Sequence, residues 1–192
     1  MIDIFEFPSE TMLQEGYKLL SNKHKCFIFS IATAKFVCVP RKGVVDEQLC
    51  FDMGYMVKEY LYDGGVIVVE KGDVDIAHFG KLNNTVRDCL GNAFLKWLSE
   101  KGLNAKRENN DILVDGYKVF GMGGRRHGEI DYTVIHIGIN TNLENIKKIC
   151  TKKMEKVPKG LGEYGITAEE VREWFLKFCG SGTYPQGWEA KK

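Results

Sequence analysis

Residues 110–121, which read NDILVDGYKVFG, decide the fold. Apolar and β-branched residues flank Asp115-Gly116, a pair typical of a two-residue turn, so the pattern predicts a β-hairpin centred there. Lys118 follows two residues later, and the sequence alone does not fix which face of its strand it occupies. On the inner face its ammonium would be held rigidly and suited to gripping a carboxylate or phosphate; on the outer face it would be a solvated lysine.

A second segment, residues 59–80, reads EYLYDGGVIVVEKGDVDIAHFG and precedes the hairpin. Asp63-Gly64-Gly65 is a turn signal, and paired glycines also let a ligand approach the backbone closely. VIVVE is typical of a buried strand, and the alternation of DVDIAHF predicts a second, half-buried strand. From these residues alone, a hairpin turn is the simpler interpretation of the glycine pair.

The remaining segments predict strands in runs, with helices between the runs. Thr167 and Glu170 form a capping box for a last helix. Predicted helices cover residues 9–20, 84–101 and 143–150, with a short one in 46–55; predicted strands cover 26–32, 36–40 and 132–140, and predicted loops 123–129 and 156–165. We therefore predict one α+β domain over residues 1–180, with a mixed, largely antiparallel sheet flanked by helices. Residues 181–192 are predicted to form a loose tail.

Composition excludes several classes of function. The chain has 27 basic and 26 acidic residues, so it lacks the basic excess of a protein that binds nucleic acid through phosphates. Its apolar runs are too short to cross a bilayer, and its acidic start does not resemble a signal peptide. None of the six cysteines forms a C-x-x-C pair. We expect a cytoplasmic protein with reduced thiols, no nucleic-acid partner and no membrane association.

Together the two segments resemble the biotin/lipoate protein ligase superfamily, most closely its lipoate–protein ligase A branch. That branch has a first motif R-R-x-S-G-G-G-A-V-Y-H-D-x-G-N-L-N, which residues 59–75 follow without a gap as EYLYDGGVIVVEKGDVD. Its second motif, N-D-L-x-V-x-G-x-K-I-S-G, corresponds to residues 110–121. The resemblance extends over residues 59–150 and implies the mixed sheet of these ligases, a fold similar to that of class II synthetases.

The resemblance also implies a reaction. ATP and an acyl acid, lipoate or octanoate, would give acyl-AMP, and the acyl group would then pass to a lysine of a lipoyl-carrier domain. Lys118 would be the catalytic residue that binds the acyl carboxylate and the α-phosphate. Asp111 would hold Mg²⁺, which prefers oxygen ligands. The implied cofactor-binding residues are Gly64, Gly65, Asn110, Asp111 and Gly121.

Departures from the first motif keep other functions open. The arginine pair falls on Glu59 and Tyr60, and two asparagines are replaced by Asp73 and Asp75, which makes a phosphate site more acidic. A non-catalytic relative that binds an acyl group, a carrier or a partner subunit is one alternative.

The second alternative is ATP-independent octanoyl transfer through a cysteine. Cys150 lies two residues before the expected position, on an apolar helix face, and is better interpreted as core. Arg125 and Arg126 could replace the missing positive charge, although a solvated turn is the simpler interpretation.

Overall fold

The structure is a computed structural model that describes residues 3–21, 26–41, 43–59, 65–80, 84–127, 130–150 and 154–180. The strands are β1 (Asp3–Glu6), β2 (Cys26–Ile31), β3 (Phe36–Val39), β4 (Met56–Glu59), β5 (Ile67–Val69), β6 (Val74–Gly80), β7 (Ala105–Glu108), β8 (Asp111–Val114), β9 (Tyr117–His127) and β10 (Ile130–Ile137). The helices are α1 (Met12–Ser21), α2 (Glu47–Asp52), α3 (Asn84–Glu100), α4 (Leu143–Ile149) and α5 (Ala168–Gly180), with a 3-10 turn η1 (Leu161–Tyr164).

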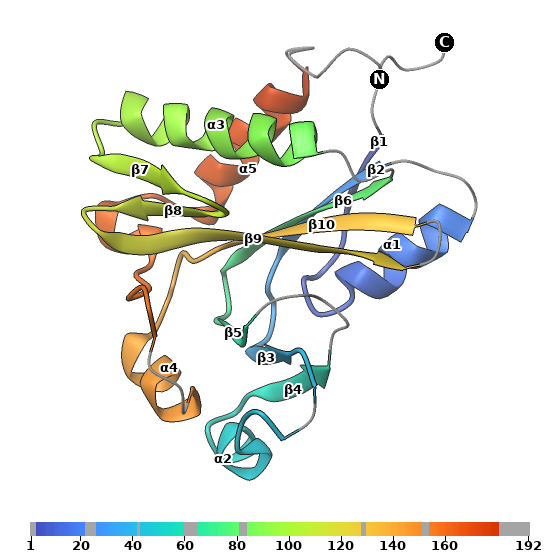
Figure 1. Cartoon of the computed structure of the whole chain (residues 1–192), viewed down its shortest axis with the longest axis vertical. Helices are drawn as coiled ribbons and strands as arrows, with labels where there is room; N and C mark the ends of the chain where they lie inside the picture. Colours follow the sequence, from blue (N-terminus) through green and yellow to red (C-terminus); the bar gives the residue numbers. More distant parts are fainter. Residues whose placement is uncertain are drawn as a thin grey trace.

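Two sheets organise these elements (Figure 1). The larger has the order β1-β2-β6-β10-β9-β8-β7, and all its neighbouring strands are antiparallel except the parallel pair β1 and β2. The smaller has the order β4-β3-β5, with β3 parallel to β4 and antiparallel to β5. The prediction of a mixed, largely antiparallel sheet flanked by helices is confirmed.

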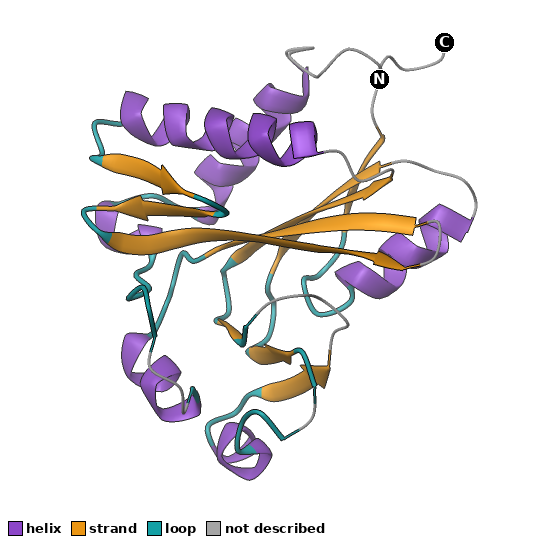
Figure 2. Cartoon of the chain, viewed as in Figure 1, coloured by secondary structure: helices purple, strands orange, loops and turns teal. Residues whose placement is uncertain are grey.

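Helices cover both faces of the larger sheet (Figure 2). On one face, α3 and α5 pack on the sheet through a core that includes Leu90, Phe94, Val171 and Phe175. On the other face, α1 packs on β2, β6 and β10, and the smaller sheet lies below with α2 and α4 against it. Strand β6 is therefore buried on both faces, so the predicted half-buried strand is wrong there. No helix in the described ranges combines the length and hydropathy needed to cross a membrane.

Local signals fixed two elements as predicted. Asp115 and Gly116 have φ angles of 51° and 85°, the left-handed pair of a tight hairpin turn, and they join β8 to β9. At α5, the Thr167 hydroxyl accepts from the Glu170 N–H at 3.2 Å, while the Glu170 carboxylate accepts from the Thr167 N–H at 3.0 Å. The predicted hairpin and capping box are both confirmed.

The predicted loop at residues 123–129 is wrong over its described part. Strand β9 continues to His127, and its residues pair with β10 from Phe120 through His127. The glycines and arginines there remain extended because a neighbouring strand completes their backbone hydrogen bonds. Residues 128 and 129 lie outside the described residues.

Helix α1 lies unusually close to the sheet at Gly16. A Cβ atom added to Gly16 would come within 2.0 Å of the Phe79 ring, so only glycine fits this contact. The ring of Phe79 in turn stacks on Tyr132 with centroids 6.0 Å apart. The contact fixes the first turns of α1 against β6 and β10.

Candidate active site

A cavity of about 600 Å³ lies between the larger and the smaller sheet. Its walls come from β9 and β10 of the larger sheet and from β3 and β5 of the smaller one, with α1 and α4 closing the sides. Most of the lining is apolar, and the polar side chains gather in one part of it. The composition suits a ligand with a long apolar portion and one charged group.

Strand β10 gives the cavity its direction. Tyr132, Val134 and His136 lie on the same face of the strand and all line the cavity. The apolar end, where Tyr132 meets Met12 and Leu13 of α1, is four residues from His136, or about 13 Å at the rise of a strand. The opposite, polar end consists of Asp75, Asp111, Lys118, His136 and Lys156.

Lys118 points into the polar end because of a bulge in β9. Phe120 pairs with Ile112 whereas Lys118 pairs with Leu113, so Val119 is an extra residue in β9. In a regular strand, residues three apart point to opposite faces; the extra residue places Lys118 and Gly121 on the same face. A Cβ atom added to Gly121 would lie 3.1 Å from the Lys118 ammonium nitrogen. The glycine therefore provides the space in which the ammonium lies.

Asp111 lies between two lysines. Its Oδ1 is 2.8 Å from Lys118 Nζ, and its Oδ2 is 2.8 Å from Lys156 Nζ. Burial raises the pKa of Asp111, but hydrogen bonds from the two ammonium groups outweigh it and hold the pKa below its usual value. Backbone pairing of Lys118 with Val157 and Lys159 brings the segment that carries Lys156 alongside β9.

His136 and Asp75 face each other across β10 and β6 at the same end. His136 Nδ1 lies 2.9 Å from Asp75 Oδ1, and Nε2 lies 3.8 Å from Asp73 Oδ2. Burial lowers the pKa of His136, but the hydrogen bond and charge of Asp75, with the charge of Asp73, raise it overall. On the other neighbouring strand, Gly121 pairs directly with His136, so Lys118 and His136 flank one glycine.

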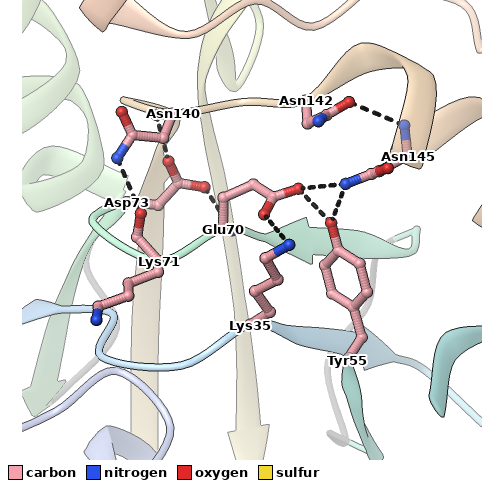
Figure 3. Close-up of polar contacts among 8 residues, drawn as sticks. All are labelled: Lys35, Tyr55, Glu70, Lys71, Asp73, Asn140, Asn142 and Asn145. Carbon is pink, nitrogen blue, oxygen red and sulfur yellow. Dashed lines mark hydrogen bonds and ion pairs between the residues drawn. The ribbon is translucent and has the colours of Figure 1, made fainter. Parts of the chain in front are cut away.

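Asp73 holds the backbone behind this pair. Its carboxylate accepts hydrogen bonds from the N–H groups of Ile139 and Asn140, both at 2.8 Å, and of Glu70 at 2.9 Å. Burial raises the pKa of Asp73 despite the opposing charge of His136 and these bonds. Asp73 thereby fixes the turn before β6 to the end of β10 (Figure 3).

A second buried network supports the smaller sheet and α4. Figure 3 shows the carboxylate of Glu70 between Tyr55, Asn145 and Lys35. The Tyr55 hydroxyl donates to Glu70, the Asn145 amide donates to the Tyr55 oxygen at 2.7 Å, and Lys35 Nζ lies 3.8 Å from Glu70. Burial and the Glu70 carboxylate raise the pKa of Tyr55, which stays a donor. Because Glu70 directly follows β5 and Asn145 belongs to α4, the network connects α4 to a strand that lines the cavity.

The structure brings most predicted site residues together. Gly65, Asn110, Asp111, Lys118 and Gly121 all line the cavity, and Gly64 lies outside the described residues. The side chains of Arg125 and Arg126 also lie outside them. Cys150 packs on the core of the smaller sheet as well as lining the cavity, and burial raises the pKa of its thiol.

Two residues of the site, Lys156 and His136, were not predicted from the sequence. Lys156 lies in a predicted loop 45 positions from Asp111, and no local pattern joins them. His136 was placed in a strand, but its pairing with Asp75 depends on the register of β10 against β6. A signal for the histidine did exist, because a histidine and two aspartates in apolar strands need polar partners.

The described residues contain no group of three or more histidine, cysteine, aspartate or glutamate side chains arranged to hold a metal. Mg²⁺ in nucleotide-dependent enzymes is held by one or two carboxylates together with substrate phosphates. Asp111 fits that role only once phosphates share the ion, since each of its oxygens already faces an ammonium group.

Comparisons with known proteins agree with this geometry. Residues 40–174 match the lipoyl protein ligase A/B catalytic domain family. No curated protein matches the chain. The match spans most of the chain, and it includes β5, β6, the hairpin, β10 and α4. The chain belongs to this family of catalytic domains.

Solved structures share the fold at low sequence identity. The putative lipoate protein ligase Ta0514 from T. acidophilum, with bound lipoic acid, is 16% identical with a TM-score of 0.72, covering 92% of this chain and 83% of that one. P. falciparum LipL1 in complex with lipoate is 17% identical with a TM-score of 0.73, covering 98% and 63%. A biotin protein ligase from Leishmania major is 10% identical with a TM-score of 0.52, covering 93% and 72%.

Proposed function

We propose that the protein activates lipoate or a medium-chain acyl acid as acyl-AMP and transfers the acyl group to a lysine of a carrier protein. The observation that carries the proposal is the Lys118 ammonium beside Gly121, at the polar end of a largely apolar cavity. The apolar end would take the chain of the acid, and the polar end its carboxylate.

Known relatives support the choice of ligands. One solved lipoate-protein ligase A, 15% identical with a TM-score of 0.73, has ATP bound. The match covers 92% of this chain and 83% of that one. An archaeal relative is described as a bi-partite lipoate protein ligase studied with its E2 lipoyl domain. We extend ATP, lipoate and a lipoyl-carrier acceptor to this protein on that basis, with octanoate as the second candidate acid.

The proposed chemistry has two steps. A carboxylate oxygen of the acid attacks the α-phosphorus of ATP, an O–P bond forms, and pyrophosphate leaves. The amine of the acceptor lysine then attacks the acyl carbon, AMP leaves, and the nitrogen loses a proton. Lys118 would orient the carboxylate and offset the negative charge that builds up at phosphorus. Asn110 and Asp111 would line the nucleotide side, with Asp111 sharing a Mg²⁺ ion with the phosphates.

Replacement of Lys118 tests this function. We expect Lys118→Ala to reduce pyrophosphate release from ATP, with lipoate or octanoate, by about 10²–10³-fold, as for loss of one preorganised charge. Lys147→Ala is the matched control, because Lys147 pairs with Glu144 on the surface of α4. Full activity in Lys118→Ala, or none in the wild type, would contradict the proposal.

The non-catalytic alternative rests on the acidic replacements. Glu59 ends β4 as an exposed carboxylate where the resemblance calls for arginine, and Asp75 lines the cavity. A protein of this kind would bind acyl acid or carrier without consuming ATP. Calorimetry with acid, alone and with ATP, separates the two functions, since a binding protein releases no pyrophosphate.

Transfer without ATP would instead need a thioester on Cys150. The raised pKa of this thiol disfavours the thiolate that such a step requires. Mass spectrometry after incubation with an octanoyl-carrier donor tests it, and an acylated Cys150 would support this route over adenylation.

A further inference from the structure

We propose that His136, oriented by Asp75, is a binding residue for the negatively charged group of the substrate and acts as an imidazolium ion. The proposal rests on the acyl-acid function above and adds a residue that the motifs of the resemblance do not contain. Where His136 is neutral in the free protein, the protein must then take up a proton when the acid binds.

The hydrogen bond to Asp75 determines which ring nitrogen of His136 is available to a ligand. A carboxylate only accepts, so Nδ1 donates its hydrogen to Asp75 at 2.9 Å. Nε2 makes no hydrogen bond with the described part of the chain, and its nearest acid, Asp73, is 3.8 Å away. The side chain is 17% exposed and lines the cavity, so Nε2 is the atom available to a ligand.

The balance of charge at the polar end explains why a proton is needed. Lys118 and Lys156 both approach Asp111, and Asp75 lies beside His136. With neutral His136, the two ammonium groups face three carboxylates, those of Asp73, Asp75 and Asp111, and this excess of negative charge opposes the binding of an anion. A protonated His136 offsets that excess, and it does so beside the same glycine that accommodates the Lys118 ammonium.

The acidic replacements noted in the sequence fit this arrangement. Asp73 and Asp75 stand where the resemblance calls for asparagine, and both carboxylates approach His136. An aspartate stabilises an imidazolium, whereas an asparagine would not. The same substitutions that make the site more acidic thus raise the pKa of His136 and favour its charged form.

The sign of the pH dependence follows from the groups that face His136. A histidine with a raised pKa is protonated below that pKa, so affinity for a carboxylate is highest there and falls as the pH rises through it. Burial raises the pKa of the nearby Cys38 well above its usual value, so the thiol does not titrate first. The charged groups that act on the imidazole are Asp73, Asp75 and Lys118, while Asp111, Lys156 and Cys38 line the same cavity.

Calorimetry of octanoate binding in buffers of different ionisation enthalpy measures the proton directly. We expect the wild type to take up a fraction of a proton when octanoate binds, and to lose about tenfold in affinity for each pH unit above the pKa of His136. His136→Gln should bind with no proton uptake and a flat pH profile. Asp75→Asn should shift the loss of affinity to lower pH, because it removes the charge that stabilises the imidazolium.

Two controls separate this effect from general ones. Lys147→Gln also removes one positive charge, but from the surface of α4, and should leave proton uptake unchanged. Octanamide has no charge, so its affinity should not follow the titration of His136. Octanoate binding without proton uptake, or unchanged uptake in His136→Gln, would overturn this inference and leave the proposed function intact. Failure of both lipoate and octanoate to bind at any pH would overturn both.

Discussion

Gly121 is the residue on which the geometry of the polar end depends most directly. Its missing side chain leaves room for Lys118, whose Cε and Nζ would lie 3.0 and 3.1 Å from an added Cβ. Asp111 Oδ1 would lie 3.4 Å away, so a larger residue would press on both members of the ion pair. Because Lys118 is 38% exposed, its side chain can move outward, and the strand itself need not change.

We therefore expect Gly121→Ala to fold normally but to bind acyl acids about tenfold more weakly, because the ammonium is displaced from the carboxylate position. Calorimetry with octanoate and a urea titration measure the two effects. Gly123→Ala is the matched control: Gly123 also lines the cavity, but its added Cβ meets nothing within 4 Å. Equal binding by the two variants would refute the role of Gly121.

At the scale of elements, local chemistry predicted some of the structure and tertiary pairing decided the rest. The hairpin at Asp115-Gly116 and the start of α5 depend on residues within four positions of each other, and both were predictable. Strands β1, β4 and β7 were missed because their short sequences are rich in charge, which is common at sheet edges. The inward face of Lys118 could not be read from alternation, because the bulge at Val119 reverses it.

The Tyr55 network predicts how α4 is held. Removal of the hydroxyl in Tyr55→Phe breaks the hydrogen bonds of Tyr55 with Glu70 and Asn145 and leaves only the direct contact between those two residues at 3.2 Å, which costs about 1–2 kcal/mol in the free energy of unfolding. Urea denaturation measures this cost, and amide exchange should show faster opening of α4. Tyr117→Phe changes an exposed tyrosine and should leave both unchanged. A Tyr55→Phe variant as stable as the wild type would show that the network does not hold α4.

On the scale of the whole molecule, the cavity exists because two sheets and two helices meet around it. No single segment contains the site: Lys118 comes from the hairpin, His136 from β10 and Lys156 from the segment after α4. The sequence could identify the hairpin lysine through a local motif. It could not identify Lys156 or the pairing of His136 with Asp75, because those depend on long-range strand register.

The close packing at Gly16 has a consequence for substrate length. Because the backbone of α1 rests against the Phe79 ring, the wall behind Met12 and Leu13 cannot retreat to admit extra methylene groups. Across a series of straight-chain acids, affinity should therefore rise with each added carbon and then drop abruptly once the chain is longer than the cavity. A gradual decline in affinity would instead indicate that the wall moves to admit longer chains. Selectivity for chain size would then be set by a helix at the opposite end of the cavity from the reacting carboxylate.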